Sequence, residues 1–221
     1  MLKKLNNLQI RDRLTRAFIM VAVILTMVSA VVLVTMIAMS RIYASTIVDY
    51  GFAQGDIGRA MSQFADSRSA MRGIIGYDEP DAIQKILSDH ETYKSEFIKE
   101  FDNLESSMIT QENKTLYKDI EDQLDDYWAF EQEIIDQGAA TDQEQCKLAQ
   151  DKALNELAPM YNSIYDDLTQ IMEIKVHKGQ EMSNMLTTII VVLTVVIIII
   201  ITGSIIFALS LGKGIANSFP V

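Results

Sequence analysis

Two arginines, Arg68 and Arg72, are the residues whose types and spacing point most directly to chemistry. They stand four residues apart in a stretch of helical periodicity, so both guanidinium groups share one face of a helix. A guanidinium donates paired hydrogen bonds to a carboxylate, and two guanidinium groups together suit a small anion. The first hypothesis is therefore that Arg68 and Arg72 bind an anionic ligand.

The second hypothesis for Arg68 is an internal ion pair with Glu131. Arg68 falls on the apolar seam of its helix, where an unpaired buried charge is costly. Glu131 lies on the inward face of a later helix, seven residues before Gly138, while Arg68 lies eight residues before Gly76. At about 1.5 Å per residue, the two side chains reach similar heights in an antiparallel bundle. The spacing therefore leaves both hypotheses open.

The other reactive residue types do not form a recognisable constellation. His90, His177 and the single Cys146 are far apart in sequence, so we expect no metal site. The sequence contains no nucleophile–base–orienter set and no phosphate-cradling glycine loop, so we expect neither catalysis nor a cofactor. His90 lies on an apolar seam, where it is either a core histidine or a pH sensor.

The acidic balance of the chain restricts its partners. The formal net charge is −11, and residues 40–185 hold 13 basic and 29 acidic residues, hence −16. Nucleic-acid binding requires basic residues to neutralise phosphates, so we expect no nucleic-acid partner. One cysteine excludes an intrachain disulfide, so the middle segment must be stabilised by packing.

Two charge-free apolar runs, residues 17–39 and 186–211, are long enough to cross a bilayer as helices. The flanking basic residues predict a cytoplasmic leader at 1–16, and the two spans place residues 40–185 outside the cell membrane and return the C-terminus to the cytoplasm. The first run exceeds the roughly 7–15 apolar residues of a signal peptide, which favours a retained anchor over a cleaved signal.

Between the two runs, apolar residues recur at steps of three and four, and no segment alternates with period two. Turn signals at Gly76–Asp81, Ser106–Thr110 and Gly138–Glu144 divide this segment into four helices, with Gly138 as a C′ residue and Thr141–Glu144 as a capping box. We predict an all-α, up-down-up-down four-helix bundle whose first and last helices continue into the two spans. Pro159 predicts a kink near residues 155–157.

In this order, the leader, spans and acidic bundle resemble the input half of a bacterial methyl-accepting chemotaxis receptor of the four-helix-bundle sensor type. The tail, residues 212–221, resembles the start of a HAMP linker. The local matches are Gly55-Asp56-Ile57, Arg68-x-x-x-Arg72, Thr141-Asp142-Gln143-Glu144 and Leu157-Ala158-Pro159-Met160-Tyr161.

The resemblance implies a multi-pass protein of the cell membrane, in contact with lipid, that forms a homodimer through its first helix and first span. It implies a stimulus from an extracellular small molecule or binding protein, transmitted through the fourth helix and second span to a HAMP and kinase-control region. Amino-acid chemoreceptors bind ligands with arginines in this part of the first helix, although this chain has Gln63 where that pattern has a further arginine. Similar bundles precede histidine kinases and diguanylate cyclases, and a ligand-free membrane-anchored adaptor bundle is a further alternative.

Overall fold

The computed structural model describes residues 10–139 and 142–216, and every regular element in these ranges is helical. The predicted all-α class is confirmed. The chain divides into two compact units. Residues 45–181 form the bundle unit, and the described residues 10–44 and 182–216 belong to the apolar unit.

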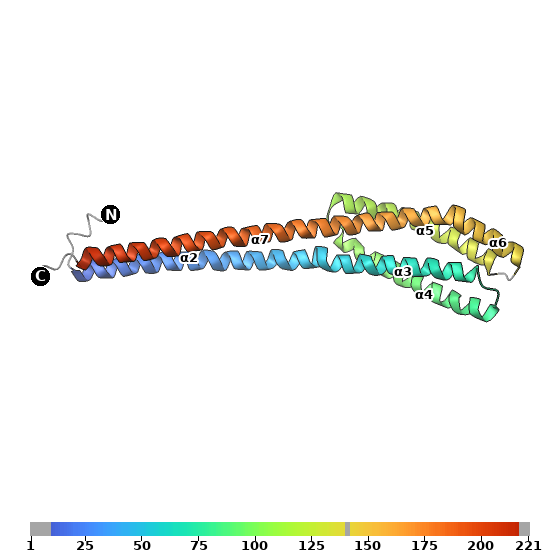
Figure 1. The fold of residues 1–221 in the computed structure, drawn as a ribbon, viewed down its shortest axis with the longest axis horizontal. Helices are drawn as coiled ribbons and strands as arrows, with labels where there is room; N and C mark the ends of the chain where they lie inside the picture. The colour runs from blue at the N-terminus through green and yellow to red at the C-terminus, as the bar shows by residue number, and fades with distance from the viewer. Residues whose placement is uncertain (1–9, 140–141, 217–221) are drawn as a thin grey trace. The chain divides into compact units, whose positions relative to one another are not determined.

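Four helical arms make up the bundle unit, and consecutive arms are antiparallel (Figure 1). The predicted four-helix bundle is therefore confirmed. The fourth arm comprises α6, η3 and residues 158–181 of α7. A π-helical turn precedes the first arm, and a 3-10 turn follows the second. The elements are η1 (Ile47–Phe52), α3 (Ala53–Ile74), α4 (Pro80–Leu104), η2 (Glu105–Ser107), α5 (Gln111–Gly138), α6 (Gln143–Lys152), η3 (Ala153–Leu157) and α7 (Ala158–Ala216).

Local signals in the sequence explain where these helices begin. Pro80 opens α4, a position where its missing N–H costs nothing. The Thr110 side chain caps α5 by accepting a hydrogen bond from the Asn113 N–H at 3.2 Å. The α6 N-cap is Asp142, whose Oδ1 accepts from the Glu144 N–H at 2.9 Å. Thr141, the first residue of the predicted capping box, lies outside the described residues.

Gly138 has a different role from the predicted one. It is the last helical residue of α5, and no glycine in the described ranges has a positive φ. A Cβ atom at Gly138 would lie 2.4 Å from Ile75 Cγ2 and 3.1 Å from Ala149 Cβ. Glycine is therefore required for the close approach of α5 to its neighbours, not for a left-handed turn.

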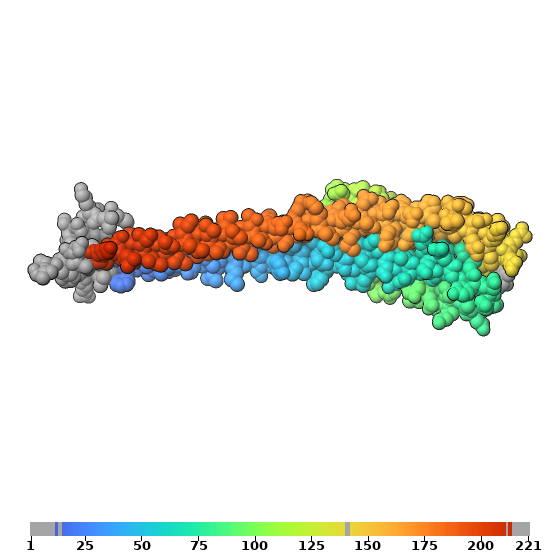
Figure 2. All heavy atoms as spheres, in the orientation of Figure 1, coloured from blue at the N-terminus to red at the C-terminus, as the bar shows by residue number. Residues whose placement is uncertain are grey.

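The core of the bundle unit is centred on Phe64 of α3, which is 0% exposed. The Phe64 ring lies 4.9 Å from Phe97, 5.1 Å from Tyr127 and 4.6 Å from Tyr161, measured between centroids. These three rings belong to α4, α5 and α7, so all four arms meet at one residue. Figure 2 shows the surfaces of α3 and of residues 158–181 meeting along the bundle unit.

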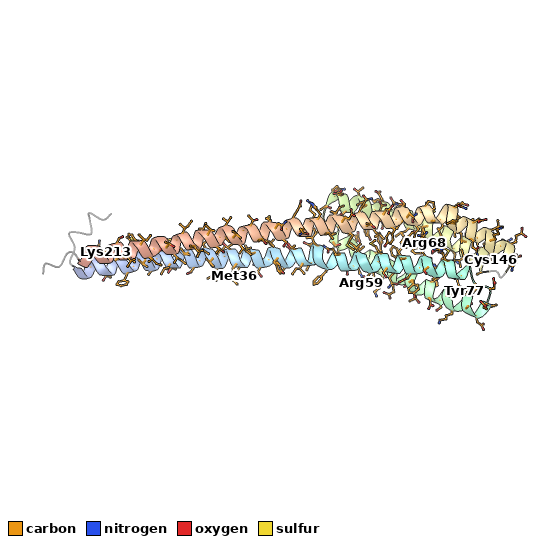
Figure 3. All side chains as sticks on the ribbon, viewed as in Figure 1. Met36, Arg59, Arg68, Tyr77, Cys146 and Lys213 are labelled. Carbon is orange, nitrogen blue, oxygen red and sulfur yellow. The ribbon has the colours of Figure 1, made fainter. Side chains whose placement is uncertain are left out.

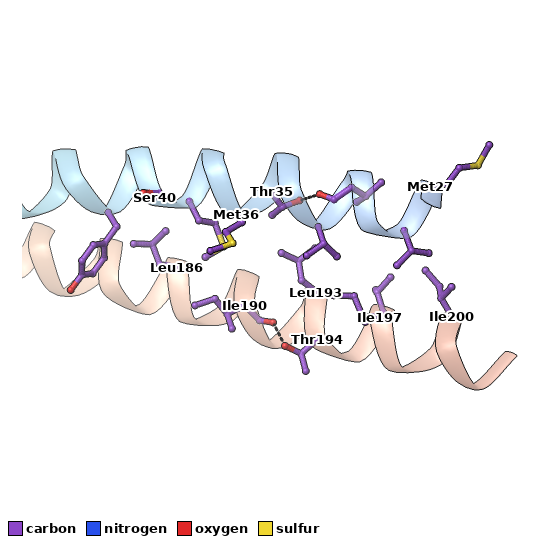
Figure 4. Close-up of a pocket in the computed structure, with 16 residues that line it drawn as sticks. Met27, Thr35, Met36, Ser40, Leu186, Ile190, Leu193, Thr194, Ile197 and Ile200 are labelled. Carbon is purple, nitrogen blue, oxygen red and sulfur yellow. Dashed lines mark hydrogen bonds between the residues drawn. The ribbon is translucent and has the colours of Figure 1, made fainter. Parts of the chain in front are cut away.

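The apolar unit contains α2 (Ile10–Thr46) and residues 182–216 of α7. Within residues 10–139 and 142–216, two helices are long and apolar enough to cross a membrane, by length and composition. Large apolar side chains on them, such as Val34 and Ile199, point outward. An apolar groove of about 700 Å³ runs between α2 and α7 within this unit (Figure 4).

Several hydroxyl groups in the apolar unit donate to carbonyls of their own helices. Thr35 donates to the Val31 carbonyl and Thr194 to the Ile190 carbonyl, each at 2.8 Å (Figure 4). Such bonding removes the cost of placing a hydroxyl in hydrocarbon, where water offers no partner. These features are compatible with helices that cross a membrane.

Candidate ligand pocket

Arg68 and Arg72 of α3 line one pocket of the bundle unit, with a volume of about 350 Å³. The opposite wall comes from the fourth arm. Figure 3 places Arg68 where α3 faces that arm. Arg68 and Arg72 share a helix face, as their four-residue spacing predicts. The lining residues are Arg68, Met71, Arg72, Ile75, Gln150, Ala153, Leu154 and Ala158.

The Arg68 guanidinium is positioned by an aromatic ring. Its Cζ atom lies 4.0 Å from the centroid of Tyr161 on α7. A cation over a ring face is attracted by the ring quadrupole, and stacking leaves the guanidinium edge free to donate hydrogen bonds. Burial raises the pKa of the Tyr161 phenol, while the positive charge of Arg68 acts in the opposite direction. Arg68 thus connects the pocket to α7.

Glu131 has partners other than Arg68. It is 1% exposed, accepts a hydrogen bond from the Tyr127 hydroxyl at 3.1 Å, and lies 3.1 Å from His90 Nε2. No Arg68–Glu131 ion pair forms among the described residues, because His90 and Tyr127 occupy the carboxylate and Tyr161 holds the guanidinium. Residue spacing indicated that Arg68 and Glu131 lie at similar heights along the bundle. It did not indicate how their helices are rotated, and the rotation determines which side chains meet.

His90 is a buried residue of α4, 1% exposed, held at Glu131. Burial raises the pKa of the Tyr127 phenol that shares this carboxylate, and the charge of Glu131 acts in the same direction. The three side chains form a polar network inside the aromatic core. His90 is therefore a core histidine held through Nε2, and its buried Nδ1 has no hydrogen-bond partner among the described residues.

Two residues that line the pocket, Gln150 and Ile75, are joined by a hydrogen bond from side chain to backbone that the sequence pattern did not predict. Gln150 Nε2 of α6 donates to the Ile75 carbonyl at 2.8 Å. Ile75 follows the last residue of α3, where carbonyls lack helical partners. The bond therefore caps α3 and attaches it to the fourth arm.

A π-helical turn forms part of the pocket wall. Pro159 has no N–H to donate to the Asn155 carbonyl, which accounts for the π-helical turn η3 at Ala153–Leu157. The sequence predicted a kink at this place. Ala153 and Leu154 of this turn line the pocket, and Leu154 is 70% exposed at its rim. Irregular backbone therefore lies directly against the two arginines.

The electrostatics of the pocket favour an anion. Its described lining contains two guanidinium groups and no carboxylate. Cations of one sign in a concave site raise the local concentration of oppositely charged ligands. The remaining walls, including Met71, Ile75 and Leu154, are apolar. The described lining therefore combines two cationic groups with apolar walls.

Comparison with known families decides what kind of domain this is. Residues 7–190 match the model of the four helix bundle sensory module for signal transduction, which covers more than half of the chain. The chain belongs to this family. No curated protein and no solved structure matches the chain.

Membership confirms the resemblance that the sequence suggested, and makes the chain a chemoreceptor-type sensory module. Modules of this family are non-catalytic and typically membrane-bound. The pocket, not a catalytic centre, is accordingly the feature of the sensory module that invites a functional test.

Proposed function

We propose that this chain is the input half of a transmembrane chemoreceptor, and that its pocket at Arg68 and Arg72 binds an extracellular small anion. The observation that carries the proposal is the pocket itself, in which two arginines of α3 face the fourth arm. That arm ends in α7, a helix whose bounds extend from Ala158 to Ala216. One helix therefore contributes both to the pocket and to the second candidate span.

The ligand is a small carboxylic acid with an apolar body. Two guanidinium groups suit one or two carboxylates, and the apolar walls suit a hydrocarbon portion. The described lining offers no carboxylate to receive an ammonium group, so amino acids are poorer ligands than the corresponding acids. The pocket volume of about 350 Å³ admits molecules of metabolite size.

The topology follows from the charges and the apolar runs. Residues 1–16 and 212–221 are cytoplasmic, residues 17–39 and 186–211 span the cell membrane, and residues 40–185 are external. The charge distribution supports this orientation, and the outward apolar side chains of the apolar unit support the spans. The compact unit of residues 45–181 lies inside the external segment.

Two copies of the chain act together, joined through the first helix and first span. Ligand binding favours one of two positions of the fourth arm, with a difference of order 1–2 Å, as for helix shifts in general. The signal continues through the second span and the HAMP linker to a kinase-control region. A module of the same design serves equally as the input of a histidine kinase or a diguanylate cyclase.

A thermal-shift screen of the full chain in lipid nanodiscs tests the ligand proposal. The probes are succinate, citrate, benzoate, aspartate and serine. We expect one or more acids to stabilise the bundle saturably, since a ligand at one hundred times its Kd adds about 2.7 kcal/mol. Arg68→Ala and Arg72→Ala should abolish this shift while helicity, measured by circular dichroism, is retained.

Arg59→Ala is the matched control, because Arg59 is an exposed arginine of α3 that pairs with Asp56 and Glu100 outside the pocket. Its ligand-induced shift should equal that of the unmodified chain. Stabilisation that survives in both Arg68→Ala and Arg72→Ala would refute the pocket assignment. Absence of any saturable shift would favour a ligand-free membrane-anchored adaptor bundle.

A further inference from the structure

Lys175 of α7 is a fully buried cation, 0% exposed. Lysine is almost never fully buried unless its ammonium group finds partners, because removing the charge from water is costly. Lys175 has no role in the proposed ligand pocket, which lies elsewhere in the bundle unit. Its burial therefore requires its own explanation.

The partners of Lys175 are backbone carbonyls from two distant stretches of chain. Its Nζ atom donates to the Asp49 carbonyl at 3.0 Å and to the Ser107 carbonyl. The same atom lies 5.6 Å from the centroid of the Tyr50 ring. One side chain of the fourth arm is thus bound simultaneously to η1 and to η2.

Both carbonyls belong to irregular backbone. Asp49 lies inside the π-helical turn η1, and π-turns in long helices are frequent at functional sites. Ser107 is the last residue of η2, directly after α4, where carbonyls carry the negative end of the helix dipole. The ammonium group therefore acts as an internal cap for one helix and a tether for another.

This set of contacts is sensitive to the axial position of α7. Both bonds run from α7 to other elements, so they restrain the axial position of α7, and a slide that stretches the 3.0 Å bond beyond about 3.5 Å would break it. Burial lowers the pKa of Lys175, while the nearby charge of Asp49 acts in the opposite direction. Backbone dipoles, not a closely paired carboxylate, hold the cation, and water competes well for such a group once it is released.

We propose that Lys175 is a latch that holds α7 in one axial register against η1 and η2, and that its release defines the second position of the fourth arm. The latch is a device of the fold and requires no particular ligand. It predicts that the unmodified chain populates one register and that removal of the cation permits another.

Distance measurements between two spin labels on the full chain in lipid nanodiscs test the latch. Cys146 is replaced by serine, and labels are attached at Ser62→Cys in α3 and Ser163→Cys in α7, both exposed positions remote from Lys175. Lys175→Met keeps the apolar stem and removes the cation. We expect one narrow distance distribution with Lys175 and a second or shifted population in Lys175→Met.

Lys178→Met is the matched control, since Lys178 is an exposed lysine of the same helix bonded to Glu181 at 2.8 Å. Its distribution should match that of the unmodified chain. A Lys175→Met distribution identical to the unmodified one would overturn the latch. If Lys175→Met does not fold, Lys175→Gln is measured instead, and failure of both to fold would overturn the latch because the side chain would then serve the fold itself.

Discussion

At the scale of single residues, the bundle is characterised by the partners of its buried and half-buried charged side chains. Arg68 stacks on Tyr161, Glu131 holds Tyr127 and His90, and Lys175 binds two carbonyls. Arg68, His90 and Lys175 each have a partner outside their own arm, whereas Tyr127 lies on the same helix as Glu131. Side chains of this kind convert the relative position of two helices into a hydrogen bond or a stacked pair that is either formed or lost.

Tyr161 should determine how well Arg68 binds an anion. Tyr161→Leu removes the aromatic face and leaves the guanidinium unsupported, so we expect affinity for the best acid of the screen to fall roughly 2- to 30-fold, the equivalent of about 0.5–2 kcal/mol. Tyr161→Phe keeps the ring and should bind within twofold of the unmodified chain. Titration calorimetry measures both, and equal affinity in Tyr161→Leu would contradict the positioning role.

Tyr117 should make the bundle sensitive to alkali. Burial, with the charges of Asp102 and Glu105, raises the pKa of Tyr117 to about 12, and its ring stacks on Phe101 at 4.4 Å. An unfolded tyrosine ionises near pH 10, so between about pH 10 and 12 the unfolded chain releases a proton that the folded chain retains. Stability contributed by the neutral phenol is therefore present below pH 10 and lost as pH rises through this window.

Urea unfolding of the chain at pH 9, 10 and 11 measures this effect against Tyr117→Phe, which has no proton to lose. We expect the free energy of unfolding to fall less steeply with pH in Tyr117→Phe than in the unmodified chain. Parallel slopes would show that Tyr117 ionises at the same pH in both states.

At the scale of elements, one proline and one glycine shape the helices of the bundle in different ways. Pro159 accounts for the π-helical turn η3 because it removes one helical donor. Gly138 lies in regular helix, and its lack of a side chain matters only because Ile75 is so close. The effect of Pro159 is thus local to its own helix, whereas the role of Gly138 depends on the neighbouring helix.

Gly138→Ala should destabilise the bundle by about 1–3 kcal/mol, because the new methyl group overlaps Ile75 and α5 must move. Gly55→Ala is the control, since its Cβ would meet only the flexible end of Arg59 at 3.7 Å. Alanine is the better helix former, so Gly55→Ala should be neutral or stabilising by up to about 1 kcal/mol. Chemical denaturation measures both, and a stabilising Gly138→Ala would contradict the packing explanation.

At the scale of the whole molecule, two units of opposite surface chemistry share one chain. The bundle unit buries an aromatic core and carries most of the acidic residues, while the apolar unit turns large aliphatic side chains outward. The first surface suits water, and the second is apolar enough to suit hydrocarbon. A sensory module built this way places its pocket and its candidate spans in different surroundings within 221 residues.

The all-α class, the four arms and the two candidate spans were predictable because they rest on local properties. These signals determine structure only in their own part of the sequence: the apolar periodicity, the helix starts at Pro80 and Thr110, and the length of each apolar run. Arg68 and Arg72 were identified as a pair for the same reason, since four residues set their common face. Only the tertiary structure decided that Tyr161 supports Arg68, that Glu131 holds His90 and that Lys175 reaches two turns. Such partners depend on the rotation and axial register of one helix against another. The packing of the whole core determines both, and residue spacing alone does not.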